Sequence, residues 1–515
     1  MKKIIILMIL PFFSYAEGID KKIDKAFAPI SDFFSNVIFF TIYDIPFVLM
    51  LLVFSALFFT VYFAFPNIRY FRIAVNTVRG KYDDLELKEK QSDDVKGTIK
   101  DESEDGEVSH FQALATAVSG TVGNGNIAGV ALAIALGGPG ATFWMIICGL
   151  LGMSTKFVEC TLGVKYRDVG EDGTVYGGPM YYISKGLKER GFEFFGKIAA
   201  ILFAIFCIGG SFGGGNAAQS NQATIVLKDL MGLESTAAGA IIGCIIAIIV
   251  GIIIIGGIKR IANVTEKVVP FMALMYLLAC LYIILINFSL VDDAISLIIT
   301  EAFNPTAIGV GSVIGVLLVG FKRAAFSNEA GAGSASIAHS AVKTKYSASE
   351  GLVALLEPFI DTVVICTMTA LVIIIFNFGG FFEYGGDGGM VYIDGVGYEG
   401  AGITSKAFAK YIPFSNVFLT IAVVLFAVST MISWSYYGLQ SWKFIFGRGY
   451  YADLTYKILF LLFIVIGAAS SMSSIWAFSD AMIFAMIFPN MVGLFFLFPV
   501  VKRELVKYLD AIKNK

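Results

Sequence analysis

Long apolar runs recur along the whole chain, and short segments rich in polar residues or glycine separate them. A helix needs roughly 20 apolar residues to cross the hydrocarbon core of a bilayer, and about eleven of the runs approach that length. The pattern therefore predicts an all-α membrane protein with about eleven transmembrane helices. We expect them at 45–66, 111–136, 140–164, 196–225, 235–257, 268–288, 306–326, 351–377, 413–440, 454–470 and 478–501.

Composition agrees with this class and argues against several others. Hydrophobic residues make up 57% of the 515 residues and charged residues 15%, whereas soluble domains have roughly a quarter charged. The net charge of -2 and the lack of a long basic run argue against a nucleic-acid partner. With two histidines and no Cys-x-x-Cys pair, the chain also has little to build a metal centre or a catalytic triad. We therefore expect no enzyme activity and no cofactor.

The N-terminus and the loop charges predict an orientation. Residues 1–16 combine two lysines, a short apolar stretch and a small-residue site, which is typical of a signal peptide. Cleaved or kept as a short anchor, this segment would leave 17–44 outside the cytoplasm. The loops then expected outside carry only Lys228, Lys406 and Lys410. Those expected inside carry Arg69, Arg72, Arg79, Lys81, Lys185, Lys188, Arg190, Lys259, Arg260, Lys343, Lys345, Lys443 and Arg448, and the tail 502–515 adds more.

This positive-inside bias predicts a multi-pass protein of the cell inner (plasma) membrane, with its N-terminus outside and its C-terminus in the cytoplasm. The densely charged segment 67–108 is expected to be a cytoplasmic loop. The segment 378–411 holds several Gly-Gly pairs and an alternating Val391-Tyr392-Ile393 run, so we interpret it as an external hairpin or lid.

Two of the expected spans contain Gly-rich interruptions. In the second span, the run SGTVGNGN (119–126) would free backbone carbonyls for a cation and N–H groups for a carboxylate. Close helix packing explains its glycines but not its two asparagines. The seventh span has a similar run at Gly309–Ser312, followed by Gly315 and Gly320. Two broken spans, five apart, predict repeats at 109–290 and 291–501, with 45–66 as an extra helix.

A carboxylate lies in the middle of the eighth span. Inserting a carboxylate such as Asp361 at mid-membrane costs roughly 2.5–3.5 kcal/mol on insertion scales, so the side chain should face the interior of the bundle. It is expected either to line an ion pathway or to pair with Lys322 or Arg323.

Amides and hydroxyls interrupt two further spans. Gln219, close to Asn221 and Gln222 in the fourth span, either hydrogen-bonds a substrate or bridges two helices. In the ninth span, Ser429, Thr430 and Ser433 share one helical face, which suits a hard cation such as Na⁺ or hydrogen bonds back to the same helix.

Several strings resemble the alanine or glycine:cation symporter family, and they extend from about 109 to 493. They are SGTVGNGNIAG (119–129), GGPGA (137–141), GGPMYYI (177–183), FSNEAGAGS (326–334), FIDT (359–362), CTMT (366–369) and STMISWSYYG (429–438). The resemblance implies a leucine-transporter-type fold of two inverted five-helix repeats, sodium coupling and alternating access.

The resemblance also implies roles for individual residues. The substrate, alanine or glycine, would contact the unwound helix and three side chains: Gly123, Asn124, Gly125, Gln219, Thr430 and Trp434. Na⁺ would be held by Asn126 in one site, and by carbonyls and hydroxyls elsewhere: Ser119, Thr121, Val122, Phe426, Ser429 and Thr430. Asp361 and Glu329 are candidate pathway or gate residues.

Together these features predict a secondary transporter that imports a small neutral amino acid with Na⁺, with the lipid bilayer as its surroundings. Proton coupling on the same fold is the alternative. An ion channel or sensor could use the same broken spans. A membrane enzyme could use Asp361 and Glu329, but no nucleophile–base pair accompanies them.

Overall fold

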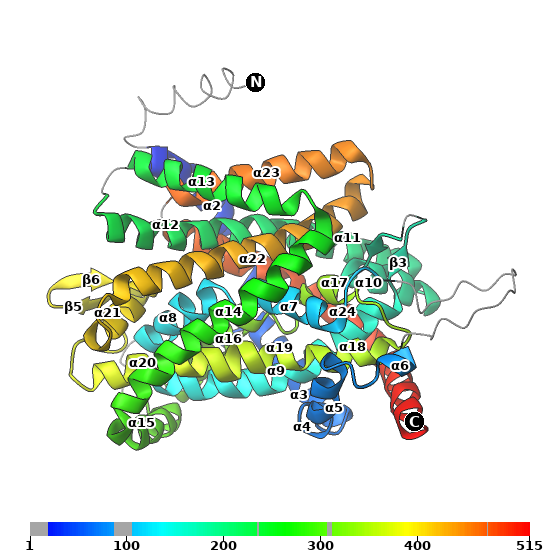
Figure 1. The fold of residues 1–515 in the computed structure, drawn as a ribbon, viewed down its shortest axis with the longest axis horizontal. Helices are drawn as coiled ribbons and strands as arrows, with labels where there is room; N and C mark the ends of the chain where they lie inside the picture. Colours follow the sequence, from blue (N-terminus) through cyan, green and yellow to red (C-terminus); the bar gives the residue numbers. More distant parts are fainter. Residues whose placement is uncertain (1–18, 87–105, 172, 234–235, 306–311, 471) are drawn as a thin grey trace, which may run out of the picture.

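The chain folds as a bundle of helices, as the computed structural model shows (Figure 1), and its described residues also form three two-stranded hairpins. The structure describes residues 19–86, 106–171, 173–233, 236–305, 312–470 and 472–515. The expected signal segment 1–16 and residues 87–105 of the loop 67–108 lie outside the described residues.

The first part of the chain builds the broken helix and the helices around it. Its helices are α2 (Ile19–Ile38), α3 (Phe47–Tyr62), α4 (Pro66–Arg69), α5 (Phe71–Val78), α6 (Asp83–Glu86), α7 (His110–Thr121), η1 (Asn124–Asn126), α8 (Ala128–Gly137), α9 (Gly140–Lys165), α10 (Pro179–Glu189), α11 (Glu193–Phe212), η2 (Gly213–Ala217), α12 (Ala218–Met231), α13 (Thr236–Ile254) and α14 (Gly257–Ile286). Its strands are β1 (Thr41–Ile42), β2 (Ile45–Pro46), β3 (Asp168–Val169) and β4 (Val175–Tyr176), paired antiparallel as β1–β2 and β3–β4.

The second part contains a further interrupted helix and the longest continuous helices. Its helices are η3 (Phe288–Leu290), α15 (Val291–Phe303), α16 (Val313–Asn328), α17 (Ala335–His339), α18 (Ser347–Ala354), α19 (Leu356–Pro358), η4 (Phe359–Cys366), α20 (Thr367–Asn377), η5 (Asp387–Gly389), α21 (Ala401–Tyr411), α22 (Ser415–Phe446), α23 (Tyr450–Ala469) and α24 (Met472–Lys513). Strands β5 (Val391–Ile393) and β6 (Val396–Tyr398) form the hairpin expected within 378–411.

Seven helices among the described residues are long and apolar enough to cross a membrane, and the bent α7–α8 pair makes an eighth. Helices Phe47–Tyr62 and Ala238–Ile254 are apolar but shorter. Each expected span overlaps a helix, although the ends differ. For example, α14 begins at Gly257 rather than at 268, because its first turns carry Lys259, Arg260 and Glu266, which an apolar pattern cannot detect.

Long-range packing brings the two halves of the chain together around α22. Figure 1 shows α22 across the middle of the bundle, with α13 and α23 on one side and α9 and α18 on the other. Helix α7 packs against both α14 and α22, and α9 packs against α16 and α18. Residues that are far apart in sequence therefore meet at the interruption after α7.

A buried group of charged residues lies between α9, α17 and α18–α19. Lys156 Nζ lies 3.0 Å from Glu357 Oε1, and both side chains have no exposed surface. Glu357 Oε2 lies 3.7 Å from His339 Nε2, and Glu350 contacts the Nδ1 atoms of both His110 and His339. A buried charge needs such partners because it has lost its water.

We expect Lys156→Met to lower the free energy of unfolding by about 3–5 kcal/mol, since it leaves Glu357 buried with only His339 as a charged neighbour. The double variant Lys156→Met/Glu357→Leu should recover most of that loss. Thermal unfolding of the purified protein in detergent measures both. Lys197→Gln, which breaks an exposed pair with Glu193, should have little effect. A double variant as unstable as the single one would contradict this account.

Candidate functional site

The second expected span is broken at its Gly-Asn run. Helix α7 ends at Thr121, α8 begins at Ala128, and the two segments are bent by 57°. At the break, Gly123 is extended (φ -134°, ψ -153°), and its N–H donates to Asn126 Oδ1 at 2.9 Å. A side-chain oxygen thus replaces the helical carbonyl that the break removes. The predicted interruption is confirmed.

Helix α12 supplies a second partner for the break. Gln219 Oε1 accepts the Asn124 N–H at 3.1 Å, while Gln219 Nε2 donates to the Gly214 carbonyl at 3.0 Å. The segment η2 before α12 is a π-helix, and a π-helical turn changes the direction in which the side chains after it point. Gln219 therefore reaches the break itself. Asn221 does not, because its amide donates to the carbonyls of Gly467 and Ser470 and so bridges helices.

Hydroxyls of α22 meet the last turn of α7. Thr430 Oγ1 donates to the Ser119 carbonyl at 3.1 Å, and Ser119 Oγ donates to the Ser429 carbonyl at 2.8 Å. Ser429 Oγ donates to the Phe426 carbonyl at 3.0 Å. Two further candidate sodium ligands, Ser429 and Thr430, thus lie against Ser119, and Phe426 is joined to them through Ser429. By contrast, the Thr121 hydroxyl turns back to carbonyls of its own helix at 3.3 Å.

Asp361 faces the interior of the bundle and contacts the break. Its Oδ1 accepts the Asn126 amide at 2.6 Å. Its Oδ2 accepts the hydroxyls of Ser327 at 2.9 Å and Thr362 at 2.7 Å. All four side chains are buried. An asparagine, a serine and a carboxylate from three separate helices thus place several oxygens in one small volume.

The expected ion pair of Asp361 with Lys322 or Arg323 is wrong. Lys322 Nζ and Arg323 NH2 lie 3.1 and 2.8 Å from Asp480 Oδ2 instead. The reason is packing, because α24 lies against α16 and brings Asp480 within reach of both cations. The side-chain partners of Asp361 are therefore uncharged hydrogen-bond donors.

A second interruption follows α16, but not at the predicted glycines. Gly309 lies outside the described residues, Ser312 caps the start of α16, and Gly315 and Gly320 lie inside an unbroken helix. The helix ends at Asn328, and α17 begins only at Ala335. Glu329 takes a left-handed conformation with φ 54° at this second break. It accepts the Trp434 indole N–H at 3.0 Å and contacts the Ser334 hydroxyl.

The two breaks enclose a small cavity of about 10 Å³, which has room for roughly one water molecule. Sequence reasoning missed four of its residues, Gly214, Phe326, Ser327 and Ile483. Phe326 and Ile483 read as ordinary core residues, whereas Ser327 belongs to the polar run before the second break. The lining comprises Gly120, Thr121, Gly125, Gly214, Gln219, Phe326, Ser327, Glu329, Thr430, Trp434 and Ile483.

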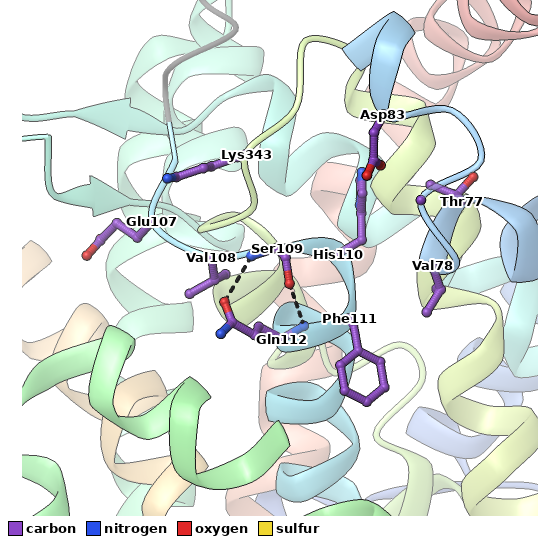
Figure 2. A pocket seen from close by; sticks show the side chains of 11 residues that line it. Thr77, Val78, Asp83, Glu107, Val108, Ser109, His110, Phe111, Gln112 and Lys343 are labelled. Carbon is purple, nitrogen blue, oxygen red and sulfur yellow. Dashed lines mark hydrogen bonds between the residues drawn. The ribbon is translucent and has the colours of Figure 1, made fainter. Parts of the chain in front are cut away.

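A larger cavity, of about 290 Å³, lies at the other end of α7 (Figure 2). There Ser109 and Gln112 form a capping box: the Ser109 hydroxyl accepts the Gln112 N–H, and the Gln112 side chain accepts the Ser109 N–H. Asp83, Glu107 and Lys343 line the same cavity. This cavity and the cavity at the breaks share no lining residue, and none of the predicted site residues lines it.

Comparisons with known proteins agree with this geometry. The chain matches the sodium:alanine symporter family over residues 30–515. The sodium/alanine symporter AgcS of Methanococcus maripaludis is 40% identical over 418 residues, which cover 81% of this chain and 87% of the relative. The amino-acid carrier protein AlsT of Bacillus subtilis is 32% identical over 440 residues, 85% of this chain and 83% of the relative.

A solved structure of MhsT in complex with L-phenylalanine aligns with a TM-score of 0.51 at 13% identity, over 78% of this chain and 99% of that one. This likeness shows the fold, which is the leucine-transporter type with discontinuous helices. The family match covers nearly the whole described chain, including both breaks and every residue around the central cavity. The chain therefore belongs to the sodium:alanine symporter family.

Proposed function

We propose that this chain imports alanine or glycine together with Na⁺ by alternating access. Sodium-coupled amino acid symport follows from the family. The finer assignment rests on one observation: the break at Gly123–Asn126 contacts Gln219 and Asp361, and its Gly125 lines one small cavity together with Gln219 and Thr430.

The proposed substrate site uses the two ends of the break. The amino acid carboxylate binds N–H groups of Gly123, Asn124 and Gly125 near the start of α8, where the helix dipole favours an anion. Gln219 and Thr430 offer polar contacts. Phe326, Trp434 and Ile483 bound the cavity and limit the substrate side chain to a small group.

The proposed sodium sites lie beside the substrate. One uses the oxygens of Asn126, Ser327 and Asp361, and hard oxygen ligands suit a hard cation. The other uses carbonyls near the C-terminal end of α7, where the helix dipole favours a cation, together with hydroxyls of α22. Its ligands would be Ser119, Val122, Phe426, Ser429 and Thr430; Thr121 would join only after its hydroxyl leaves its own helix.

Transport requires the cavity to open, because an amino acid is much larger than the one water molecule it can hold. Glu329 hydrogen-bonds Trp434 across the second break, so this contact is the candidate gate. One Na⁺ entering down about 100 mV and a tenfold gradient gains roughly 3.7 kcal/mol, which sustains an accumulation of several hundredfold.

We also infer the topology from the charges. The repeats 109–290 and 291–501 follow an extra helix at 45–66, with the N-terminus outside and the C-terminus in the cytoplasm of a cell with an inner membrane. Two loops predicted inside lie together in support of this, since Lys185 and Arg448 both pair with Asp168. Partial burial opposes ionisation of Asp168, but hydrogen bonds from Lys185 and Arg448 hold the pKa of that carboxyl below its usual range.

In proteoliposomes, an inward sodium gradient should drive accumulation of labelled alanine, and unlabelled glycine should compete better than leucine or glutamine. Replacing sodium by choline should abolish accumulation, and a proton gradient should not restore it. Accumulation driven by protons in choline would instead select the proton-coupled alternative. Flux that does not saturate would indicate a channel.

Gly123→Ala should abolish sodium-dependent uptake, because the added Cβ would lie 2.5 Å from Thr430 Oγ1 and 3.1 Å from Gln219 Oε1. Gly125→Ala is the matched control for steric effects at the break. Its Cβ would meet Ser327 only at 3.6 Å, an ordinary contact, so uptake should fall by much less. Initial uptake rates at equal protein amounts provide the comparison, and equal loss in both variants would refute the assigned contact.

Asp361→Asn should raise the sodium concentration for half-maximal uptake at least tenfold, because it removes the one carboxylate from the proposed Asn126 site. Alanine affinity at saturating sodium should change less. Glu159→Gln is a matched control, since this buried carboxylate binds Asn490 rather than Asn126. An unchanged sodium titration for Asp361→Asn would remove Asp361 from the ion site.

A further inference from the structure

A basic pocket lies at the ends of three membrane-crossing helices, away from the transport site. Helix α9 ends there at Lys165, α18 begins there at Ser347, and the last turns of α24 pass it at Glu504 and Lys507. Its volume is about 150 Å³, compared with about 10 Å³ for the cavity at the breaks. Its lining comprises Val164, Lys165, Arg167, Val169, Thr344, Lys345, Ser347, Glu504 and Lys507.

The charges in this pocket do not balance. Four basic side chains line it against one carboxylate, Glu504. Both oxygens of Glu504 are occupied, because Oε1 pairs with Lys165 Nζ at 2.8 Å and Oε2 accepts the Ser347 hydroxyl at 3.2 Å. Among the described residues, neither Lys345 nor Lys507 has a carboxylate partner. The pocket therefore holds excess positive charge.

The two unpaired lysines converge on one aromatic ring. The Nζ atoms of Lys345 and Lys507 each lie 5.8 Å from the ring centroid of Tyr346. Two cations without carboxylate partners beside one ring favour a bound anion. The hydroxyl of Ser347 is taken by Glu504, but as the first residue of α18 this serine places the positive end of a helix dipole at the same wall.

We propose that this pocket binds a phosphate group, supplied by the headgroup of an anionic phospholipid. The position favours a lipid over a soluble anion, since the ends of three spans mark the level at which headgroups lie. The pocket is also partly apolar, because Val164 and Val169 line it. A bound headgroup would tie together the ends of α9, α18 and α24.

The test compares lipid binding to the full-length protein and to Lys345→Gln/Lys507→Gln, using native mass spectrometry with phosphatidylglycerol. Affinity should fall roughly 30-fold, because each basic residue near an anionic surface contributes about fivefold. Lys188→Gln/Lys513→Gln removes the same charge at exposed sites outside the pocket and should leave affinity unchanged. Equal loss in the two double variants, or none in the first, would overturn the proposal.

Two further arms identify the source of the phosphate. Thermal protection by phosphatidylglycerol vesicles but not by phosphatidylcholine vesicles, lost in Lys345→Gln/Lys507→Gln, supports the lipid. Equal protection by inorganic phosphate in phosphatidylcholine supports the same site with a soluble ligand. Protection by neither overturns the proposal. Sodium-dependent uptake by Lys345→Gln/Lys507→Gln in phosphatidylcholine vesicles shows that this variant is folded. If a variant that still transports loses the thermal protection, the loss concerns the basic pocket and not the proposed transport mechanism.

Discussion

The structure depends on one constraint: backbone groups freed in the middle of a membrane helix must find partners. At the break after α7 those partners are side chains from three directions. Asn126 accepts the Gly123 N–H, Gln219 accepts the Asn124 N–H, and Thr430 donates to the Ser119 carbonyl. A continuous helix does not offer such polar groups to the proposed ion and substrate.

Close backbone approach makes these contacts reachable. A Cβ on Gly215 would lie 2.1 Å from Trp434 Cγ, and one on Gly438 would lie 2.2 Å from Ser211 Oγ, so α22 can lie directly on α11 and η2. The same approach brings Thr430 and Trp434 to the two breaks. The glycines between α11 and α22 therefore act on the site through helix spacing rather than through contact with a ligand.

The sequence predicts the first break but not the second, and the reason is that glycine has two uses in a membrane helix. Two asparagines mark the run at Gly123 as more than packing. Gly320 lies in an unbroken helix and serves close packing, since a Cβ there would lie 2.6 Å from the Ala141 carbonyl oxygen, whereas Gly331 takes a φ of +96° in the real interruption. A single sequence cannot separate close packing from backbone reversal. Nor can it pair Asp361 with Asn126, since that contact depends on how helices 235 residues apart are packed.

Asn126 joins the two halves of the proposed cycle. Its Oδ1 holds the Gly123 N–H, while its Nδ2 donates to Asp361. A sodium ion needs oxygen ligands, so an ion between Asn126 and Asp361 must displace the Nδ2 contact and draw on Oδ1. That weakens the hold of Oδ1 on the Gly123 N–H and makes this donor available to a carboxylate. Because linkage is reciprocal, a substrate bound at Gly123 would in turn strengthen sodium binding at Asn126. In the proposed cycle, this one amide side chain would thus couple the ion to the solute.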